Sequence, residues 1–590
     1  MKKKLSFLAI VGLIVTMLGS VVGVSAQGPG EGGIIFDYDL SDPTDFNPLI
    51  SGDVTSSNVW SKMYPNVFGV DSATGAYAPG YKDSLAVSWE FDETGTVLTV
   101  KLREDAFWTD GVQITSKDFI WMLEALRSGL LDTQRGGETW ETLDDGTPGS
   151  GLLVDAVAID DFTVELTFSR ADCNSLNEIF ATVVPSHIFE EDFGDDLAAM
   201  NDDPLYDPGV YFGSFVAPDF VPGDRVSMIA NQDYIDAELG YVSPSEWVTL
   251  NIPDQDVAVE RFRAGELTYM GIPATYQSEF EDDPNFQTYR FPRRGYVFYA
   301  FNHANPDNPQ AAYDEEGNYI EQEPHPVLGD KLVRQAIVMS VDMDAIIENN
   351  LDGNAVRVGV GTIPSSWDYD PDQLYPFDPV AAAEMLDEAG WVMGDGDYRV
   401  CQGCAYAAID PDYEGTEMAL MLNDSTGGTE QSKLMVEFIA QSMRDIGINA
   451  EVQELDWGSA FLPELTGQTF DMAILAWSLG LPLDPDSTSI FSREVDVPGS
   501  GFNFGSFHNA EIEQLYKDAR DPAKTNNCSL EGRLPYYQRA NEIIFDELPY
   551  MFMYANLSMS AAHSWVEGWD PVVFSTTWNA DSWTAIAPVE

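Results

Sequence analysis

The stretch FWTDGVQITSKDF, Phe107 to Phe119, contains the local pattern that decides how this part of the chain folds. A turn at Asp110-Gly111 is followed by Thr115 and Asp118, which have the T-x-x-D spacing of a helix start. In this motif the hydroxyl caps backbone N–H groups and the acid lies near the positive helix end. The expected buried face of the helix consists of Phe119, Ile120, Leu123 and Leu126. The stretch therefore predicts strand, turn and helix, and it contains no nucleophile and no metal-binding cluster.

The segments on either side of this stretch predict β-hairpins. SLAVSWEFDETGTVLTVKLR, Ser84 to Arg103, indicates two strands around a turn at Glu93-Thr94-Gly95, because apolar and polar residues alternate after the turn. Leu152 to Phe168 indicates a second hairpin that turns at Asp160-Asp161. Closer to the N-terminus, residues 34–64 are rich in Asp, Pro and Ser and are expected to be extended.

A more regular alternation of helices and strands begins near residue 329. We expect one helix over Gly329 to Ile347, and another that Asp378 caps and Gly390 ends. The next elements are a strand at Met418–Leu422, a helix at Glu430–Ile446, a strand at Ile448–Leu455, a short helix after Trp457 and a strand at Phe470–Trp477. This β-α-β-α-β order predicts a parallel sheet with helices on its faces. Two amphipathic helices, Ala510–Arg520 and Arg533–Glu547, are expected near the C-terminus.

The N-terminal residues 1–26 have the features of a secretory signal peptide. Three lysines precede an apolar run, and Val24-Ser25-Ala26 fits a small-residue cleavage site after Ala26. An uncleaved N-terminal anchor is the alternative. No later stretch has the roughly 18 consecutive apolar residues of a membrane span. We therefore expect an exported protein that is soluble in the periplasm or at the extracellular face, with two or three domains.

The chain is strongly acidic, with 98 Asp and Glu against 29 Lys and Arg and a net charge of −69. Such a surface repels nucleic acid and anionic membranes. Because the acids are scattered along the sequence, a solvated surface or a saline environment explains them more simply than an acidic recognition site.

The four cysteines are an even number in an exported chain, which suggests disulfides. Three pairings are conceivable. Cys401 and Cys404 are close enough to pair locally, which would leave Cys173 to pair with Cys528. The alternative for Cys401 and Cys404 is half of a zinc site, but the sequence has no second CxxC or paired-histidine motif to complete it.

Catalytic and cofactor motifs are missing from the sequence. The five histidines form no HExxH pair, no serine lies in G-x-S-x-G, and there is no phosphate-binding G-x-x-x-x-G-K-[ST] loop. DYDPD, Asp368 to Asp372, begins like a calcium loop but has Gln373 and Pro379 where Gly and Glu are needed. We expect no enzyme activity, no metal and no cofactor.

The order of segments resembles the family 5 extracellular solute-binding proteins, the capture subunits of ABC importers for peptides, nickel chelates and some sugars. The resemblance runs from about Ile34 to the C-terminus. It rests on eight segments in the family's order: LAVSWEFDETGTVLTVKLREDAFWTDGVQITSKDFIW, PGDRVSMIANQDY, VERFRAGEL, LVRQAIVMSVDMDAII, YPFDPVAAAEMLDEAGW, QSMRDIGINAEVQELDW, FDMAILAWSLGLPLDPD and GFNFGSFHNAEIEQL.

This resemblance implies an α/β, bilobed periplasmic-binding-protein-like fold of type II, with two lobes and an added N-terminal subdomain. Lobe I would comprise residues 27–75, 176–295 and 491–590, the added subdomain residues 76–175, and lobe II residues 296–490. With the added subdomain counted as part of the composite lobe, Cys173 and Cys528 would lie in the same lobe. The implied function is capture of a peptide-like solute between the lobes and its delivery to permease subunits, by a protein that is expected to be a monomer.

The resemblance also places the ligand contacts. Trp477 and the loop after it, with Ser478 and Gly480, match a segment that lines the cleft, and Trp457 matches a second aromatic position. Near the N-terminus, Gly52, Thr55 and Ser56 match the segment that lies along the ligand. The family's usual aspartate position holds Gly480, so Asp484 or Asp486 would have to take its role. Ile474 replaces an arginine of some peptide binders. These departures favour a ligand held by aromatic stacking over one clamped by charges.

Three alternatives remain open at this stage. An oligosaccharide could take the place of the peptide, because the cleft residues are aromatic. The aromatic and acidic composition would also suit an exported glycan-degrading enzyme. A chaperone or adhesion protein could keep the same fold without import.

Overall fold

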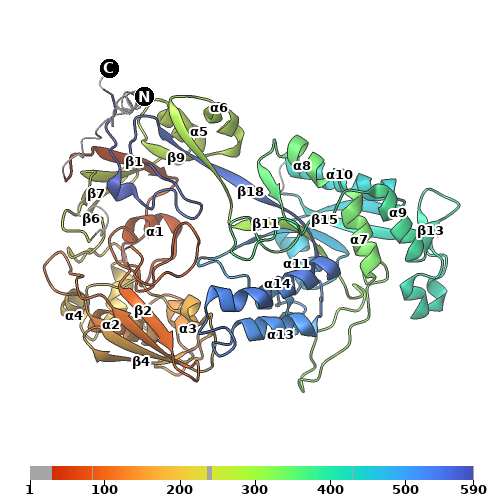
Figure 1. Ribbon diagram of the computed structural model, residues 1–590, viewed down its shortest axis with the longest axis horizontal. Coiled ribbons are helices and arrows are strands. Elements are labelled where there is room, and N and C mark those ends of the chain that lie inside the picture. The colour runs from red at the N-terminus through yellow and green to blue at the C-terminus, as the bar shows by residue number, and fades with distance from the viewer. Residues whose placement is uncertain (1–28, 83, 236–241, 428–429, 589–590) are drawn as a thin grey trace, which may run out of the picture.

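The computed structural model describes residues 29–82, 84–235, 242–427 and 430–588. The chain forms two lobes, with a subdomain attached to the first (Figure 1). The predicted α/β fold of two lobes and an added N-terminal subdomain is confirmed. The predicted signal peptide, residues 1–26, lies outside the described residues. Within the described ranges, no helix is long and apolar enough to span a membrane.

The N-terminal subdomain contains the opening stretch and an antiparallel sheet in the order β2-β3-β5-β4. Its elements are β2 (Ala86–Phe91), β3 (Val97–Leu102), α2 (Ser116–Arg127), α3 (Arg135–Thr139), β4 (Leu153–Asp160), β5 (Thr163–Phe168) and α4 (Ser186–Phe193). Both hairpins and the helix start are confirmed. Thr115 caps α2, and the Asp118 carboxylate accepts from the Thr115 backbone N–H at 2.9 Å. Phe119, Leu123 and Leu126 are buried and Ile120 is partly buried.

Lobe I is built on a second sheet in the order β1-β8-β7-β6, in which β1 and β8 are parallel. Its elements are β1 (Ile34–Asp39), α1 (Val54–Trp60), β6 (Phe215–Val221), β7 (Arg225–Ala230), β8 (Glu246–Asn251), α5 (Gln255–Arg263) and α6 (Gln277–Glu281). Helix α1 corrects the expectation that residues 34–64 are extended throughout. The Asp53 side chain caps this helix by accepting from the Ser56 N–H. The composition, rich in Asp and Ser, was interpreted as extended chain, and this capping bond was not predicted.

The mixed sheet β10-β18-β11-β17-β15-β16, which β9 and β12 join at β18, forms the centre of lobe II and continues through β9, β10 and the C-terminal half of β18 to the lobe I side. The strands are β9 (Tyr269–Ile272), β10 (Phe286–Pro292), β11 (Gly295–Phe301), β12 (Ala355–Arg357), β15 (Ala419–Ser425), β16 (Asn449–Leu455), β17 (Met472–Ser478) and β18 (Tyr550–His563). Strand β15 is parallel to both β16 and β17, which confirms the predicted parallel unit. Strand β11 pairs antiparallel with β17, and β18 pairs antiparallel with β11.

Helices cover both faces of the lobe II sheet. One face packs against α7 (Lys331–Ser340), α8 (Met343–Asn350), α9 (Pro379–Glu388) and α10 (Glu430–Asp445), with the hairpin β13 (Trp391–Met393) and β14 (Arg399–Cys401) beyond them. The other face packs against α11 (Leu462–Thr466), α12 (Thr488–Phe491), α13 (Ala510–Ala519) and α14 (Leu530–Glu547). The single helix expected over Gly329–Ile347 is two helices, because the Asp342 side chain accepts from the Ala345 N–H and caps α8.

The position of α13 and α14 differs from the expectation that residues 491–590 belong to lobe I. Ile512, Tyr516, Tyr537 and Ile544 share a hydrophobic core with Phe298 of lobe II. The segment that packs with lobe I follows β18, where Trp569 and Trp583 join the lobe I core.

The chain passes between the lobes from β10 to β11 and again within β18. The C-terminal half of β18 pairs with β10 and β9 on the lobe I side, and its N-terminal half pairs with β11 and β12. These strands connect the two lobes, and β11 and β18 run across the centre of the molecule (Figure 1).

The four cysteines form two disulfides, as predicted, so Cys401 and Cys404 are not half of a zinc site. Cys401–Cys404 lies in lobe II, and Cys173–Cys528 joins residues 355 positions apart. Because Cys528 lies between α13 and α14, the second bridge links the subdomain to lobe II and not two parts of one lobe. The Cys173 N–H also donates to the Arg520 carbonyl at 2.7 Å, and an Arg533 Nη donates to Asn174 at 2.8 Å.

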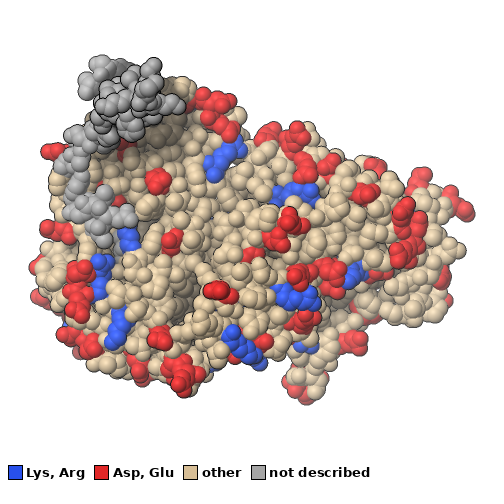
Figure 2. All heavy atoms as spheres, viewed as in Figure 1, with Lys and Arg blue, Asp and Glu red and all other residues tan. Residues whose placement is uncertain are grey.

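The acidic side chains are scattered over the face shown in Figure 2, among fewer lysines and arginines. This distribution agrees with the interpretation of the negative charge as a solvated surface.

Candidate functional site

Four cavities that share lining residues adjoin the boundary between lobe I and lobe II, and we call them together the cleft. The tryptophan cavity has a volume of about 330 Å³ and is lined by residues that include Tyr296, Trp367, Trp477 and Phe502. It shares Ser478 and Leu479 with the arginine cavity, of about 530 Å³, whose lining includes Arg293, Arg294 and Thr577. The arginine cavity shares Phe291, Arg293 and Thr577 with the lysine cavity, of about 490 Å³, which contains Asp37, Asp39 and Lys62. A smaller cavity of about 220 Å³ shares Leu483 and Asp484 and ends at the Cys173–Cys528 bridge.

Trp477 forms an aromatic wall of the tryptophan cavity. It is the second-last residue of β17, and its backbone faces Tyr296 of β11 in the sheet register. Its ring is stacked on Phe298 at 6.1 Å and 16° and on Phe504 at 5.9 Å and 9°, while Phe502 meets its edge. Three aromatic neighbours therefore fix the indole at the end of a strand, where ligands bind in open α/β sheets. Ser478, Gly480 and Asp484, also expected at the site, line the same cavity.

Trp457 does not line any of these cavities. It begins a helical turn at Trp457–Phe461, its side chain is 51% exposed, and its ring stacks on Phe461 at 5.1 Å. The aromatic sandwich of Trp457 and Trp477 stays a prediction.

Asp484 is already engaged inside the protein. Its carboxylate lies 2.7 Å from an Arg533 Nη and accepts from the Tyr537 hydroxyl at 3.2 Å. Asp486 lies 3.4 Å from Arg520, and burial raises the pKa of Asp486 to about 6. Both acids of the loop after β17 therefore face arginines of the α13–α14 region, and this pairing fixes the loop that borders the cleft.

The N-terminal residues expected along the ligand shape the start of α1. Ser56 is buried, and its hydroxyl accepts from the Thr44 N–H at 2.9 Å. The Thr55 hydroxyl contacts the Ser41 hydroxyl at 3.2 Å. A side chain at the position of Gly52 would point into open space. Asn58 of this helix and Lys62, which follows it, line the lysine cavity. The contact of Gly52, Thr55 and Ser56 with a ligand stays a prediction.

The lysine cavity holds partly buried charges that the sequence analysis missed. Lys62 Nζ lies 4.6 Å above the Trp247 ring. Burial lowers the pKa of Lys62, and the nearby carboxylates of Asp37 and Asp39 oppose this shift. Burial raises the pKa of Asp39 to about 6. The sequence offered one signal for Lys62. The chain has only 29 lysines and arginines, so each one is a candidate for a specific role.

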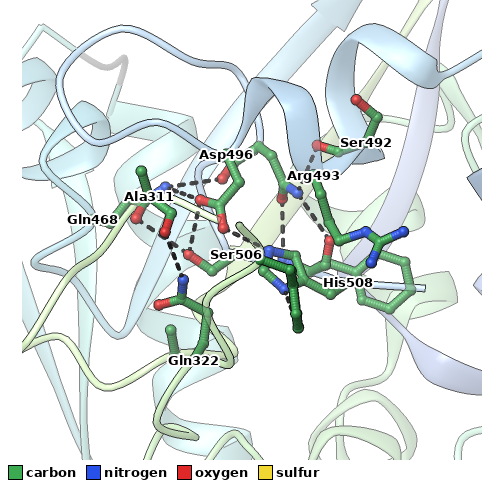
Figure 3. Close-up of polar contacts among 12 residues, drawn as sticks. Ala311, Gln322, Gln468, Ser492, Arg493, Asp496, Ser506 and His508 are labelled. Carbon is green, nitrogen blue, oxygen red and sulfur yellow. Dashed lines mark hydrogen bonds and ion pairs between the residues drawn. The ribbon is translucent and has the colours of Figure 1, made fainter. Parts of the chain in front are cut away.

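A buried polar cluster beside the lobe II sheet contains a histidine–aspartate pair (Figure 3). Asp496 is fully buried and lies 2.6 Å from His508 Nε2. The Gln468 amide donates to this carboxylate at 2.6 Å and the Ser506 hydroxyl at 3.1 Å. The other His508 nitrogen faces the Tyr319 hydroxyl at 3.1 Å, so no serine is bonded to the histidine as nucleophilic catalysis requires. The cluster instead ties the loop after β11 to the segment after α12.

Within the described ranges, no group of three or more His, Cys, Asp or Glu side chains could hold a metal ion. The cleft offers aromatic rings, hydroxyls and a few charged groups, which is the composition of a binding site for a small molecule.

Comparison with known proteins identifies the family. Residues 80–497 match the family described as bacterial extracellular solute-binding proteins, family 5, middle region. The oligopeptide-binding protein AppA of Bacillus subtilis (strain 168) is 25% identical over 567 residues, which cover 95% of this chain and 93% of AppA.

Solved structures show the same fold along nearly the whole chain. AppA from Bacillus subtilis in complex with a nonapeptide is 22% identical, with a TM-score of 0.60 and coverage of 95% of this chain and 100% of that one. NikZ from Campylobacter jejuni in complex with Ni(L-His) is 20% identical, with a TM-score of 0.61 and coverage of 94% and 100%. The chain therefore belongs to family 5 of the bacterial extracellular solute-binding proteins, which are non-catalytic solute-binding subunits of ABC transporters.

Proposed function

We propose that this protein captures a peptide-like solute in the cleft between its lobes and delivers it to the permease subunits of its transporter. The observation that carries this proposal is the set of cavities that share lining residues at the boundary of the lobes, with Trp477 fixed in the wall of one of them. The similarity to AppA, which is named as an oligopeptide-binding protein, supports a peptide as the ligand. Hinge closure around a ligand would bring the two lobes together.

Two hydrogen bonds of Leu483 support closure of the lobes over this cleft. The Leu483 N–H donates to the Gly75 carbonyl at 2.8 Å and joins the loop after β17 to the lobe I side. The Trp367 indole N–H donates to the Leu483 carbonyl at 3.1 Å and holds the same loop against lobe II. Residues 478–487 would therefore form part of the lid over a bound solute. We further propose that the protein acts as a monomer outside the membrane, in the periplasm or at the extracellular face.

An oligosaccharide is the second candidate, because the half-buried Trp477 and the 52% exposed Phe502 line the tryptophan cavity and aromatic rings can stack on a sugar face. Mass spectrometry of the ligand that copurifies with the protein, followed by thermal-shift titration, separates the two candidates. A ligand at 100 times its dissociation constant adds about 2.7 kcal/mol of stability. Stabilisation by peptides and not by oligosaccharides supports the proposal. Flat melting curves across both libraries contradict solute capture in this cleft.

A further inference from the structure

The arginine cavity carries two positive charges and, among the described residues that line it, no acid. Arg293 and Arg294 occupy the link between β10 and β11, where the chain passes from lobe I to lobe II. In a protein with 98 acidic and 29 basic residues, a cavity with this lining is unusual. It places a positive field inside a molecule whose surface is negative.

Arg293 and Arg294 also differ from the other arginines in their pairing. Of the arginines in the part of the chain that the structure describes, Arg135, Arg293 and Arg294 have no ion pair. Arg135 is packed against the Phe180 ring at 4.3 Å. Arg293 and Arg294 are exposed in the cleft, so they are the pair whose charges a ligand can reach.

Both guanidinium groups keep donors available. Arg293 Nε donates to the Ser558 hydroxyl at 2.8 Å, and Arg294 Nη1 makes a long contact with the Leu479 carbonyl at 3.4 Å. A guanidinium has five N–H donors, so most of them have no acceptor among the described residues. The hydroxyls of Ser478, Ser575 and Thr577 line the same cavity and could donate to the same ligand group.

We propose that the arginine cavity binds a carboxylate of the transported solute, an inference that rests on the proposed function of the cleft. Guanidinium groups bind planar carboxylates through two parallel N–H···O bonds, and exposed cations in a cleft also attract the ligand from a distance. Ser478 comes from lobe II and Thr577 from the lobe I segment after β18, so one bound carboxylate contacts both lobes. The sequence favoured a ligand held by aromatic stacking over one clamped by charges. The arginine cavity adds a charged contact where the chain passes between the lobes.

The carboxylate can be the C-terminus of a peptide or an acidic side chain. A synthetic library of peptides three to five residues long distinguishes these sources when each sequence is made as the free acid, as the C-terminal amide, and with Glu replaced by Gln. The library is incubated with the wild-type protein and with the Arg293→Gln/Arg294→Gln variant, and retained peptides are quantified by mass spectrometry after gel filtration.

We expect the wild type to retain one carboxylate-bearing form about tenfold or more over its neutral counterpart, because a hydrogen bond to a charged group contributes this much. The double variant should retain both forms equally. The matched control is Arg261→Gln/Arg539→Gln, which removes the same charge from ion pairs on α5 and α14, outside the cleft. A wild type without preference, or the same preference in the double variant, overturns the proposal.

A second measurement keeps the test independent of peptide capture. If the wild type retains no peptide in any form, the peptide part of the proposed function fails. The cavity is then tested by thermal-shift titration with succinate at constant ionic strength. A rise in Tm that the wild type and the control share and the Arg293→Gln/Arg294→Gln variant lacks supports the carboxylate site. Equal shifts in all three proteins overturn it.

Discussion

The rings of Trp477 and Phe504 are parallel to within 9°, with their centroids 5.9 Å apart. Phe504 follows α12 in sequence and Trp477 is the second-last residue of β17, so this stack joins the wall of the cleft to the core below the sheet. The indole is therefore positioned before a ligand arrives, and less side-chain entropy is lost on binding.

We expect Trp477→Ala to weaken ligand binding about tenfold or more, because it removes both a stacking surface and buried contact area. Isothermal titration with the copurified ligand measures this change. Trp565→Ala is the matched control, since Trp565 stacks on His563 in lobe I and does not line the cleft. Unchanged affinity in Trp477→Ala, with a folded protein by circular dichroism, would remove this residue from the site. Trp457→Ala tests the predicted sandwich in the same way.

Loss of the Cys173–Cys528 bridge should destabilise the protein by up to about 5 kcal/mol, because the bridge constrains the unfolded chain over a long loop. The Cys173→Ser/Cys528→Ser variant and urea denaturation measure this difference. Cys401→Ser/Cys404→Ser is the control, and it should cost less because its loop spans a sequence separation of 3. Equal losses in both variants would contradict the loop-length argument. Peptide mapping without reduction should find both bridges in the exported protein.

The buried carboxyl group of Asp368 leads us to expect that the free energy of unfolding depends on pH. It is buried, it accepts from the Asn541 amide at 2.8 Å, and burial raises its pKa to about 6. The folded state therefore holds this proton more tightly than the unfolded chain, so the wild type loses stability from this group as pH rises from about 4 to 6. Asp368→Asn should be more stable than wild type above pH 6, by up to about 3 kcal/mol, with the difference disappearing near pH 4.

Urea denaturation across this pH range measures the effect of Asp368→Asn. Asp370→Asn serves as the control, because Asp370 is an exposed aspartate in the same loop. A difference between Asp368→Asn and wild type that is constant with pH would show that the substitution acts through packing and not through titration.

We expect the main role of the Asp484–Arg533 ion pair to be stabilisation of the fold. Arg533→Gln leaves a partly buried carboxylate without its partner and should cost about 3–5 kcal/mol, while Asp484→Asn/Arg533→Gln should recover part of this loss. A double-mutant cycle by urea denaturation gives the coupling. Comparing N-acetylated with free peptides in Asp484→Asn decides whether this carboxylate also binds a ligand amino group, as the sequence suggested.

Local patterns allowed the individual elements to be predicted. The capping box at Thr115 and Asp118, and the cap of α9 at Asp378, depend on residues within one helical turn of each other. The break between α7 and α8 was missed because an apolar face continues across Asp342, whose capping bond competes with one continuous helix.

Long-range pairings could not be predicted in the same way. Strand β11 pairs with β17 although Tyr296 and Trp477 are far apart in sequence, and this register fixes the tryptophan in the cleft. The placement of α13 and α14 on lobe II depends on which apolar face finds which sheet, and amphipathicity alone does not specify the partner. Arg293 and Arg294 gain their meaning from the absence of nearby acids in the described cavity, which is a property of the folded chain.

The Cys173–Cys528 bridge gives lobe II a second attachment to the rest of the molecule, in addition to the strands that cross between the lobes. One attachment is the strand crossing from β10 to β11 and within β18, and the other is the bridge at the far end of the cleft. A body fixed at two points can rotate only about the line that joins them, so twisting and sliding of the lobes are suppressed.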